Sequence, residues 1–112
     1  MRRTWVTVQI DRPMGSVHPK HPDIVYPINY GYVPGIMGGD GEEQDAYILG
    51  VDYLLDRFAG WVVAIIHRRD DVEDKWVVAP KGFEPTEEEI RAATHFQEQY
   101  FDSWVELTSM DP

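Results

Sequence analysis

The sequence contains no cysteine and no long hydrophobic run. The lack of cysteine excludes disulfide bonds, thiol catalysis and zinc or iron–sulfur sites with cysteine ligands, and it suits a reducing compartment. The longest apolar run, residues 61–66, is far shorter than the roughly 20 residues that a membrane-spanning helix requires. We therefore expect a cytoplasmic protein that does not cross a membrane.

Basic residues are also scarce. The sequence has 10 lysines and arginines and 20 aspartates and glutamates, which gives a net charge of −10 at pH 7. Phosphate backbones and anionic lipid surfaces repel such a chain, so we expect neither a nucleic-acid partner nor a membrane partner. An anionic ligand would need metal ions between itself and the protein. The 112 residues, 43% of them hydrophobic, suffice for one domain with one core, spanning residues 1–112.

Four short segments predict β-strands. Residues 5–10 alternate apolar and polar side chains, which is typical of a half-buried strand. Segments 46–51, 60–67 and 75–79 are short, rich in valine and isoleucine, and bounded by acidic or glycine-containing turns. All four segments precede any helical pattern in the chain.

The remaining segments predict one rigid irregular region and one helix. Residues 11–39 are dense in proline and glycine, which excludes a helix there. Thr86 and Glu89 have the spacing of a capping box, and apolar residues continue at helical spacing to about Trp104. Strands followed by one packing helix predict a mainly β (α+β) fold, a small β-barrel with a C-terminal helix packed on it.

The first acidic turn, residues 39–45, is the first candidate for chemistry. It places Asp40, Glu42 and Asp45 at positions i, i+2 and i+5, and like charges this close are costly unless a cation lies among them. An EF-hand calcium loop is excluded, because counting from Asp40 puts Asp45 where glycine is required and Val51 where glutamate is required. A solvated acidic turn between two strands is the alternative interpretation.

The second acidic turn, residues 68–75, is another carboxylate cluster, flanked by cations and placed between two predicted strands. If both turns open on one rim of a barrel, their carboxylates converge, and divalent cations would relieve the repulsion. Such an oxygen-rich set favours Mg²⁺, which fills its remaining positions with water and substrate phosphate. The alternative is a charged hairpin whose ion pairs each contribute little.

A resemblance to a known family starts from the run Tyr-Pro-Ile-Asn-Tyr-Gly-Tyr at 26–32, which is followed eight residues later by Asp40 of the first acidic turn. This order and spacing resemble the signature of the family I soluble inorganic pyrophosphatases. The second acidic turn with its lysine and the segment 95–100 are similar to later parts of that family, so the resemblance spans residues 4–100. It implies an OB-like five-stranded β-barrel with helices, which hydrolyses inorganic pyrophosphate using several Mg²⁺ ions.

Site residues follow from this resemblance by position. It implies that Asp40 and Asp45 are metal ligands and that Asp70 is a ligand from the second acidic turn. Another ligand from that turn is Asp74 or Glu73. Glu73 shares a strand face with the lysine of the turn, whereas Asp74 is the better chemical match.

The resemblance also assigns roles in catalysis. Glu42 occupies the position of the aspartate that acts as general base towards water. Lys75, Tyr30 and Tyr100 would contact phosphate oxygens as charge and hydrogen-bond donors. The leading hypothesis is therefore Mg²⁺-dependent hydrolysis of pyrophosphate or a related phosphoanhydride, and a homo-oligomer is left open.

Several positions depart from the family pattern. Gln9 stands where the family carries a glutamate, and Phe101 replaces a lysine. The basic substrate-binding segment is compressed into residues 11–25, where four residues could substitute: Arg12, His18, Lys20 and His21. These departures motivate an alternative hypothesis, a non-catalytic relative that binds metal and phosphate as a sensor or scaffold. A third hypothesis is an acidic protein-interaction module without a small-molecule site.

Overall fold

The computed structural model describes residues 2–109. Six strands and one helix follow one another in the order β1 Trp5–Arg12, β2 Tyr30–Met37, β3 Glu43–Ile48, β4 Arg57–Arg68, β5 Lys75–Ala79, α1 Glu87–Glu98 and β6 Ser103–Leu107. Strands β3 and β4 begin earlier in the chain than the apolar runs that predicted them. Among the described residues, no helix is long and apolar enough to cross a membrane.

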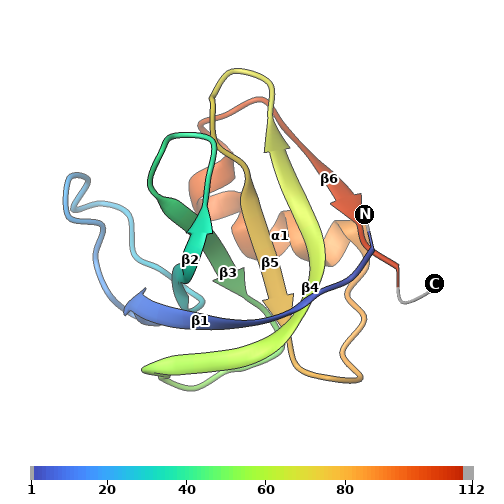
Figure 1. Ribbon diagram of the computed structural model, residues 1–112. Helices are drawn as coiled ribbons and strands as arrows, with labels where there is room; N and C mark the ends of the chain where they lie inside the picture. Colours follow the sequence, from blue (N-terminus) through green and yellow to red (C-terminus); the bar gives the residue numbers. More distant parts are fainter. Residues whose placement is uncertain (1, 110–112) are drawn as a thin grey trace.

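The sheet closes into a five-stranded barrel. Its strands follow the order β1-β2-β3-β5-β4, and β1 also pairs with β4, which closes the ring. Strands β3 and β5 run parallel, and β6 adds to the outer edge of β4 in an antiparallel pairing. In Figure 1, helix α1 lies behind the sheet, and strands β1 and β4 cross in front of it. The predicted OB-like barrel with a C-terminal helix is confirmed.

Strand β2 occupies part of the segment that was predicted to be irregular. Residues 30–33 pair with β3 in regular register, and the register then shifts between Val33 and Met37. The proline and glycine at 34–35 fall inside this irregularity, where a missing N–H and a positive φ do not interrupt the ladder. The prediction of an irregular region was therefore wrong for β2, although no helix forms in residues 11–39.

The predicted helix begins correctly but ends too late. The capping box of Thr86 and Glu89 is present in both directions, and α1 ends at Glu98. The chain then turns, and Arg69 donates its backbone N–H to the carbonyl of Asp102 at 2.8 Å. Trp104 therefore lies on β6, opposite His67 of β4, because pairing with the edge of the sheet outcompetes further helical turns.

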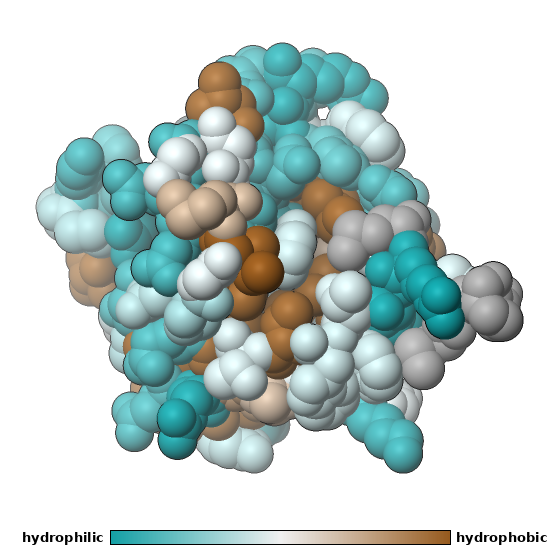
Figure 2. Space-filling view, viewed as in Figure 1, coloured by the Kyte–Doolittle hydropathy of each residue, from teal (hydrophilic) through white to brown (hydrophobic). Residues whose placement is uncertain are grey.

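The hydrophobic core has two parts. Inside the barrel, small β-branched side chains such as Val8, Val62 and Val78 pack together. Between sheet and helix, a second cluster includes Tyr47 and Ile90, both with no exposed surface. On the face shown in Figure 2, hydrophilic residues form a broad border and hydrophobic residues gather near the centre.

Candidate active site

The two acidic turns pack directly against each other. Gly39 lies so close to the second acidic turn that a Cβ atom there would collide with the carbonyl oxygen of Val72. The Gln44 side chain donates a hydrogen bond of 2.8 Å to the carbonyl of Asp74. Both acidic turns therefore open on one end of the barrel, as the hypothesis of a shared site requires.

A cavity of about 800 Å³ lies at this junction. The acidic turns, residues 12–24 and the end of α1 form its walls. Six of the residues that the sequence singled out line it: Tyr30, Asp40, Glu42, Asp45, Lys75 and Tyr100. Two others, Asp70 and Asp74, are not part of the lining.

Lys75 is the buried cation at the floor of this cavity, with only 2% of its surface exposed. Its Nζ donates to three oxygens, those of Asp45 at 2.6 Å, Glu73 at 2.7 Å and the Tyr30 hydroxyl at 2.8 Å. The Tyr30 hydroxyl in turn donates to Asp45 at 2.8 Å. Burial and the negative charge of Asp45 raise the pKa of Tyr30 well above its ordinary value. All three protons of the Lys75 ammonium are thus engaged by the protein itself.

The carboxyl groups of Asp40 and Glu73 form a hydrogen bond across the junction of the turns. This bond lowers the pKa of Asp40, whereas burial and then the same bond raise the pKa of Glu73. Two carboxyl groups this close cannot both carry a full charge without a proton or a cation between them. Glu73 thereby joins Asp40 to the two buried cations, because its carboxylate also accepts from Lys75 and from Arg68.

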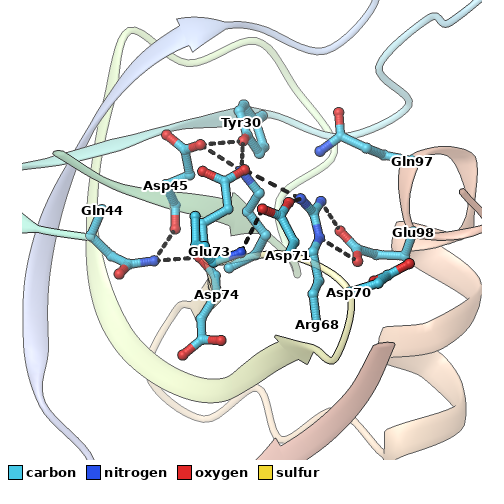
Figure 3. Close-up of polar contacts among 12 residues, drawn as sticks. Tyr30, Gln44, Asp45, Arg68, Asp70, Asp71, Glu73, Asp74, Gln97 and Glu98 are labelled. Atoms are coloured by element: carbon cyan, nitrogen blue, oxygen red, sulfur yellow. Dashed lines mark hydrogen bonds and ion pairs between the residues drawn. The ribbon is translucent and has the colours of Figure 1, made fainter. Parts of the chain in front are cut away.

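The structure places the two predicted ligands from the second acidic turn, Asp70 and Asp74, outside the cavity lining. The Asp74 carboxylate points away from Asp45 and Glu73 (Figure 3) and lies 3.3 Å from the imidazole of His67. Asp70 accepts the backbone N–H of Asp102 at 3.1 Å. Because side chains alternate along an extended chain, Glu73 shares the inner face with Lys75, and Asp74 takes the outer one. Of the two alternatives left open by the sequence, Glu73 is the one that lines the cavity.

Arg68 is the site residue that the sequence did not identify. It lies at the end of β4, its side chain is only 2% exposed, and it binds carboxylates on two sides. Its guanidinium forms a two-pronged pair with Glu98, at 2.6 and 3.1 Å, and also donates to Asp71 and Glu73 (Figure 3). A usable signal was an arginine that directly continues a buried apolar strand, since a buried arginine requires carboxylate partners.

A chain of buried hydrogen bonds extends from Glu98 across the cavity floor. Tyr47 donates to Glu98 at 2.7 Å and accepts from the Gln97 side chain at 2.8 Å. The oxygen of Gln97 accepts from the Tyr26 hydroxyl at 3.0 Å, and that hydroxyl accepts from Arg12 at 2.8 Å. The helix end, the barrel and the basic segment are thereby held in one fixed arrangement.

The compressed segment 11–25 supplies a basic wall of the cavity, together with the carboxylate of Asp23. Arg12, His18, Lys20 and His21 all line the cavity, and the two imidazole rings lie 4.9 Å apart. Gln9, in contrast, is not in the lining, and its side chain donates to the carbonyl of Asp56 at 3.1 Å. The cavity therefore has an acidic wall and a basic wall.

The donor chemistry of the acidic wall fits Mg²⁺. Asp40, Glu42, Asp45 and Glu73 all offer carboxylate oxygens, the ligands that hard divalent cations prefer. Within residues 2–109, no three acidic or histidine side chains are already grouped closely enough to enclose a metal ion. Mg²⁺ commonly uses only one or two carboxylates and completes its shell with water and phosphate, so a pregrouped cluster of three is not required.

A closed five-stranded barrel with one packed helix and a charged cavity at its end defines a class of small β-barrel folds, and several solved structures share this fold. Inorganic pyrophosphatases from three bacteria match over 93–94% of this chain, and the match spans 80–86% of their own chains. The protein from Ehrlichia chaffeensis gives a TM-score of 0.68 at 16% identity, and those from Helicobacter pylori and Neisseria gonorrhoeae each give 0.61 at 19% and 18% identity. The chain therefore has the inorganic pyrophosphatase fold, as the sequence resemblance implied.

The sequence comparisons add no closer relative. No protein-family model matches the sequence, and no curated protein matches it. The likeness is therefore one of fold.

Proposed function

We propose that this protein hydrolyses inorganic pyrophosphate to two phosphates with Mg²⁺ as cofactor. The observation that carries the proposal is the convergence of the first acidic turn, Tyr30 and Lys75 on one cavity of a barrel with the pyrophosphatase fold. The acidic wall suits divalent cations and the basic wall suits phosphate oxygens. We propose the cytoplasm as its location, because the chain lacks cysteine and the substrate is a metabolite.

Asp40 and Asp45 would hold Mg²⁺ at the mouth of the cavity. When bound there, Mg²⁺ supplies Lewis-acid activation of water and neutralises charge on the diphosphate. Glu42 is exposed at the same mouth and would accept the proton of the attacking water. Glu73, in contact with Asp40, would orient that ligand from the second acidic turn.

Lys75 and Tyr30 would act on the leaving phosphate from the floor. Because all three Lys75 protons are already engaged, a phosphate oxygen can reach Nζ only by replacing one of the present acceptors. Until then, the lysine contributes a positive charge fixed beneath the substrate. Arg12 and Tyr100 would bind the outer phosphate at the rim.

Asp45→Asn tests this assignment, with Asp74→Asn as the matched control on the outer face of the second acidic turn. The first variant should lose a Mg²⁺ ligand and lower kcat by on the order of a hundredfold, because a misplaced reactant costs about that much. The second should keep its rate. Phosphate release is measured with pyrophosphate, triphosphate and nucleoside triphosphates, with and without Mg²⁺. Equal rates for the two variants, or no turnover by the unmodified protein, would contradict the proposal.

A second candidate is a non-catalytic protein that binds metal and phosphate. It is favoured by one observation, the full engagement of Lys75 and Arg68 by carboxylates of the protein. Calorimetry separates the two functions. Tight binding of Mg²⁺ and pyrophosphate without release of phosphate supports the non-catalytic protein.

A further inference from the structure

We propose that Arg68 takes the place of a divalent cation at the second acidic turn, so that the cavity binds metal ions at the first acidic turn alone. The inference deepens the proposed function, because it concerns how many metal ions the same cavity holds. It starts from the ion pairs around the guanidinium.

Carboxylates from two separate parts of the chain converge on Arg68. Glu98 comes from the end of α1, and Asp71 and Glu73 come from the second acidic turn. The distances are 2.6 Å to Glu98, 3.0 Å to Asp71 and 3.2 Å to Glu73. A set of oxygens gathered in this way from distant segments is the arrangement that a cation produces, and here a guanidinium occupies its centre (Figure 3).

Little room remains at this point for a hydrated metal ion. The Nε, Nη1 and Nη2 atoms of Arg68 all donate to carboxylate oxygens. The ring of Phe101 covers the guanidinium face at 3.6 Å, where cation and ring attract each other. Mg²⁺ retains several water molecules, and the covered guanidinium excludes them. Phe101 therefore seals the pair of Arg68 and Glu98 from the solvent.

The first acidic turn differs from the second in its ion pairs. Asp40 and Glu42 are exposed, and neither forms an ion pair with an arginine or lysine among those found in residues 2–109. The joined cluster of both turns contains two buried cations, Arg68 and Lys75, against five carboxylates: Asp40, Asp45, Asp71, Glu73 and Glu98. The first acidic turn thus presents to the cavity two carboxylates, Asp40 and Glu42, that neither buried cation pairs with.

Titration with Mn²⁺, a paramagnetic substitute for Mg²⁺, gives the number of metal sites in the full chain without substrate. Electron paramagnetic resonance titration gives the number of bound ions for the unmodified protein, Asp71→Asn and Arg68→Met. We expect Asp71→Asn to bind as many ions as the unmodified protein, because the carboxylate of Asp71 pairs with Arg68 and not with a metal ion. Arg68→Met should gain about one ion per chain, because methionine leaves Asp71 and Glu98 without their cation and leaves Glu73 with Lys75 alone. Arg69→Met, an exposed neighbour, is the matched control and should keep the original count.

Thermal unfolding gives a second measurement. Mg²⁺ should raise the Tm of Arg68→Met by more than it raises that of Arg69→Met, since a ligand that binds only the folded state stabilises it. The double variant Arg68→Met with Glu98→Gln should lose the added ion again.

The proposal is overturned if Asp71→Asn lowers the Mn²⁺ count, or if folded Arg68→Met binds no additional ion. Should Arg68→Met fail to fold, the Asp71→Asn count still decides. Because neither measurement uses pyrophosphate, their outcome is separate from that of the activity assay on Asp45→Asn.

Discussion

Lys75 and Arg68 show at the level of single residues why this site is built of ion pairs. Each is almost fully buried, and each is bound by one carboxylate 30 residues away in the sequence, Asp45 or Glu98, and by Glu73 of the second acidic turn. Removing one partner of a buried pair leaves an uncompensated charge, which costs about 3–5 kcal/mol. The same contacts therefore hold the acidic turns together and set the charge of the cavity.

Glu42→Gln tests the proposed general base. The amide has nearly the same shape but cannot accept a proton, so kcat should fall by about 10²–10⁴-fold. Because Glu42 is exposed, the free energy of unfolding should stay within about 0.5 kcal/mol of its original value. Steady-state kinetics and urea unfolding give the two quantities.

Glu43→Gln, the exposed neighbour, is the control for Glu42→Gln. Its side-chain oxygen accepts the N–H of Gly35 at 2.9 Å, and an amide oxygen can do the same. Its kcat should be unchanged. Equal kcat values for both variants would remove Glu42 from the catalytic role.

At the level of elements, the contact between the two acidic turns forms one wall of the cavity. The two turns lead into the neighbouring parallel strands β3 and β5, and their close approach also depends on the missing side chain of Gly39 beside Val72. Gln44 of β3 fixes the same junction by bridging to the carbonyl of Asp74. Two loops between different strand pairs thereby become one wall of the cavity.

Gly39→Ala should separate these turns. The added methyl group meets backbone rather than a flexible side chain, and such overpacking costs about 1–3 kcal/mol. Activity should fall together with stability, because Asp40 moves away from Glu73. Urea unfolding and phosphate release measure both effects.

Gly38→Ala is the matched control, since a Cβ there meets only ordinary contacts and φ is not positive. If the two alanine variants behaved alike, close packing of the turns would not be what positions the carboxylates.

At the level of the whole molecule, buried tyrosines couple folding to alkaline pH. Burial, and then the nearby carboxylates Asp45 and Glu98, raise the pKa of Tyr30 and of Tyr47 well above 10. The unfolded chain ionises these hydroxyls near pH 10, whereas the folded chain keeps both protons. The stability due to this difference is therefore complete below pH 10 and is lost as pH rises through the folded-state pKa values.

Unfolding free energy measured in urea between pH 8 and pH 11 should fall above pH 10. Each tyrosine should contribute a slope of about 1.4 kcal/mol per pH unit. Tyr47→Phe should be less stable at pH 8 by about 1–3 kcal/mol, because Glu98 loses a hydrogen-bond donor. Above pH 10, its unfolding free energy should fall less steeply, because the contribution of one tyrosine to the slope is missing. Identical slopes for the two proteins would contradict the coupling.

Features that depend on neighbouring residues were predictable from the sequence. The alternation in β1, the valine-rich β5 and the capping box at Thr86 are each decided within a few residues, and each formed as expected. The acidic turns were also local patterns, but their spacing left open whether they meet, and only the folded chain brings Asp40, Asp45 and Lys75 to one cavity.

Features that depend on competition between distant segments required the tertiary structure. Helix α1 ends before Trp104 because β4 offers an edge for β6, and no local pattern reveals that edge. Whether Glu73 or Asp74 faces inward depends on the register of β5 against β4. The sequence by itself determined which charges this protein carries and in which turns they lie. Only the folded chain decided which carboxylates meet Arg68, because an ion pair forms wherever packing brings its partners together, whatever their distance along the chain.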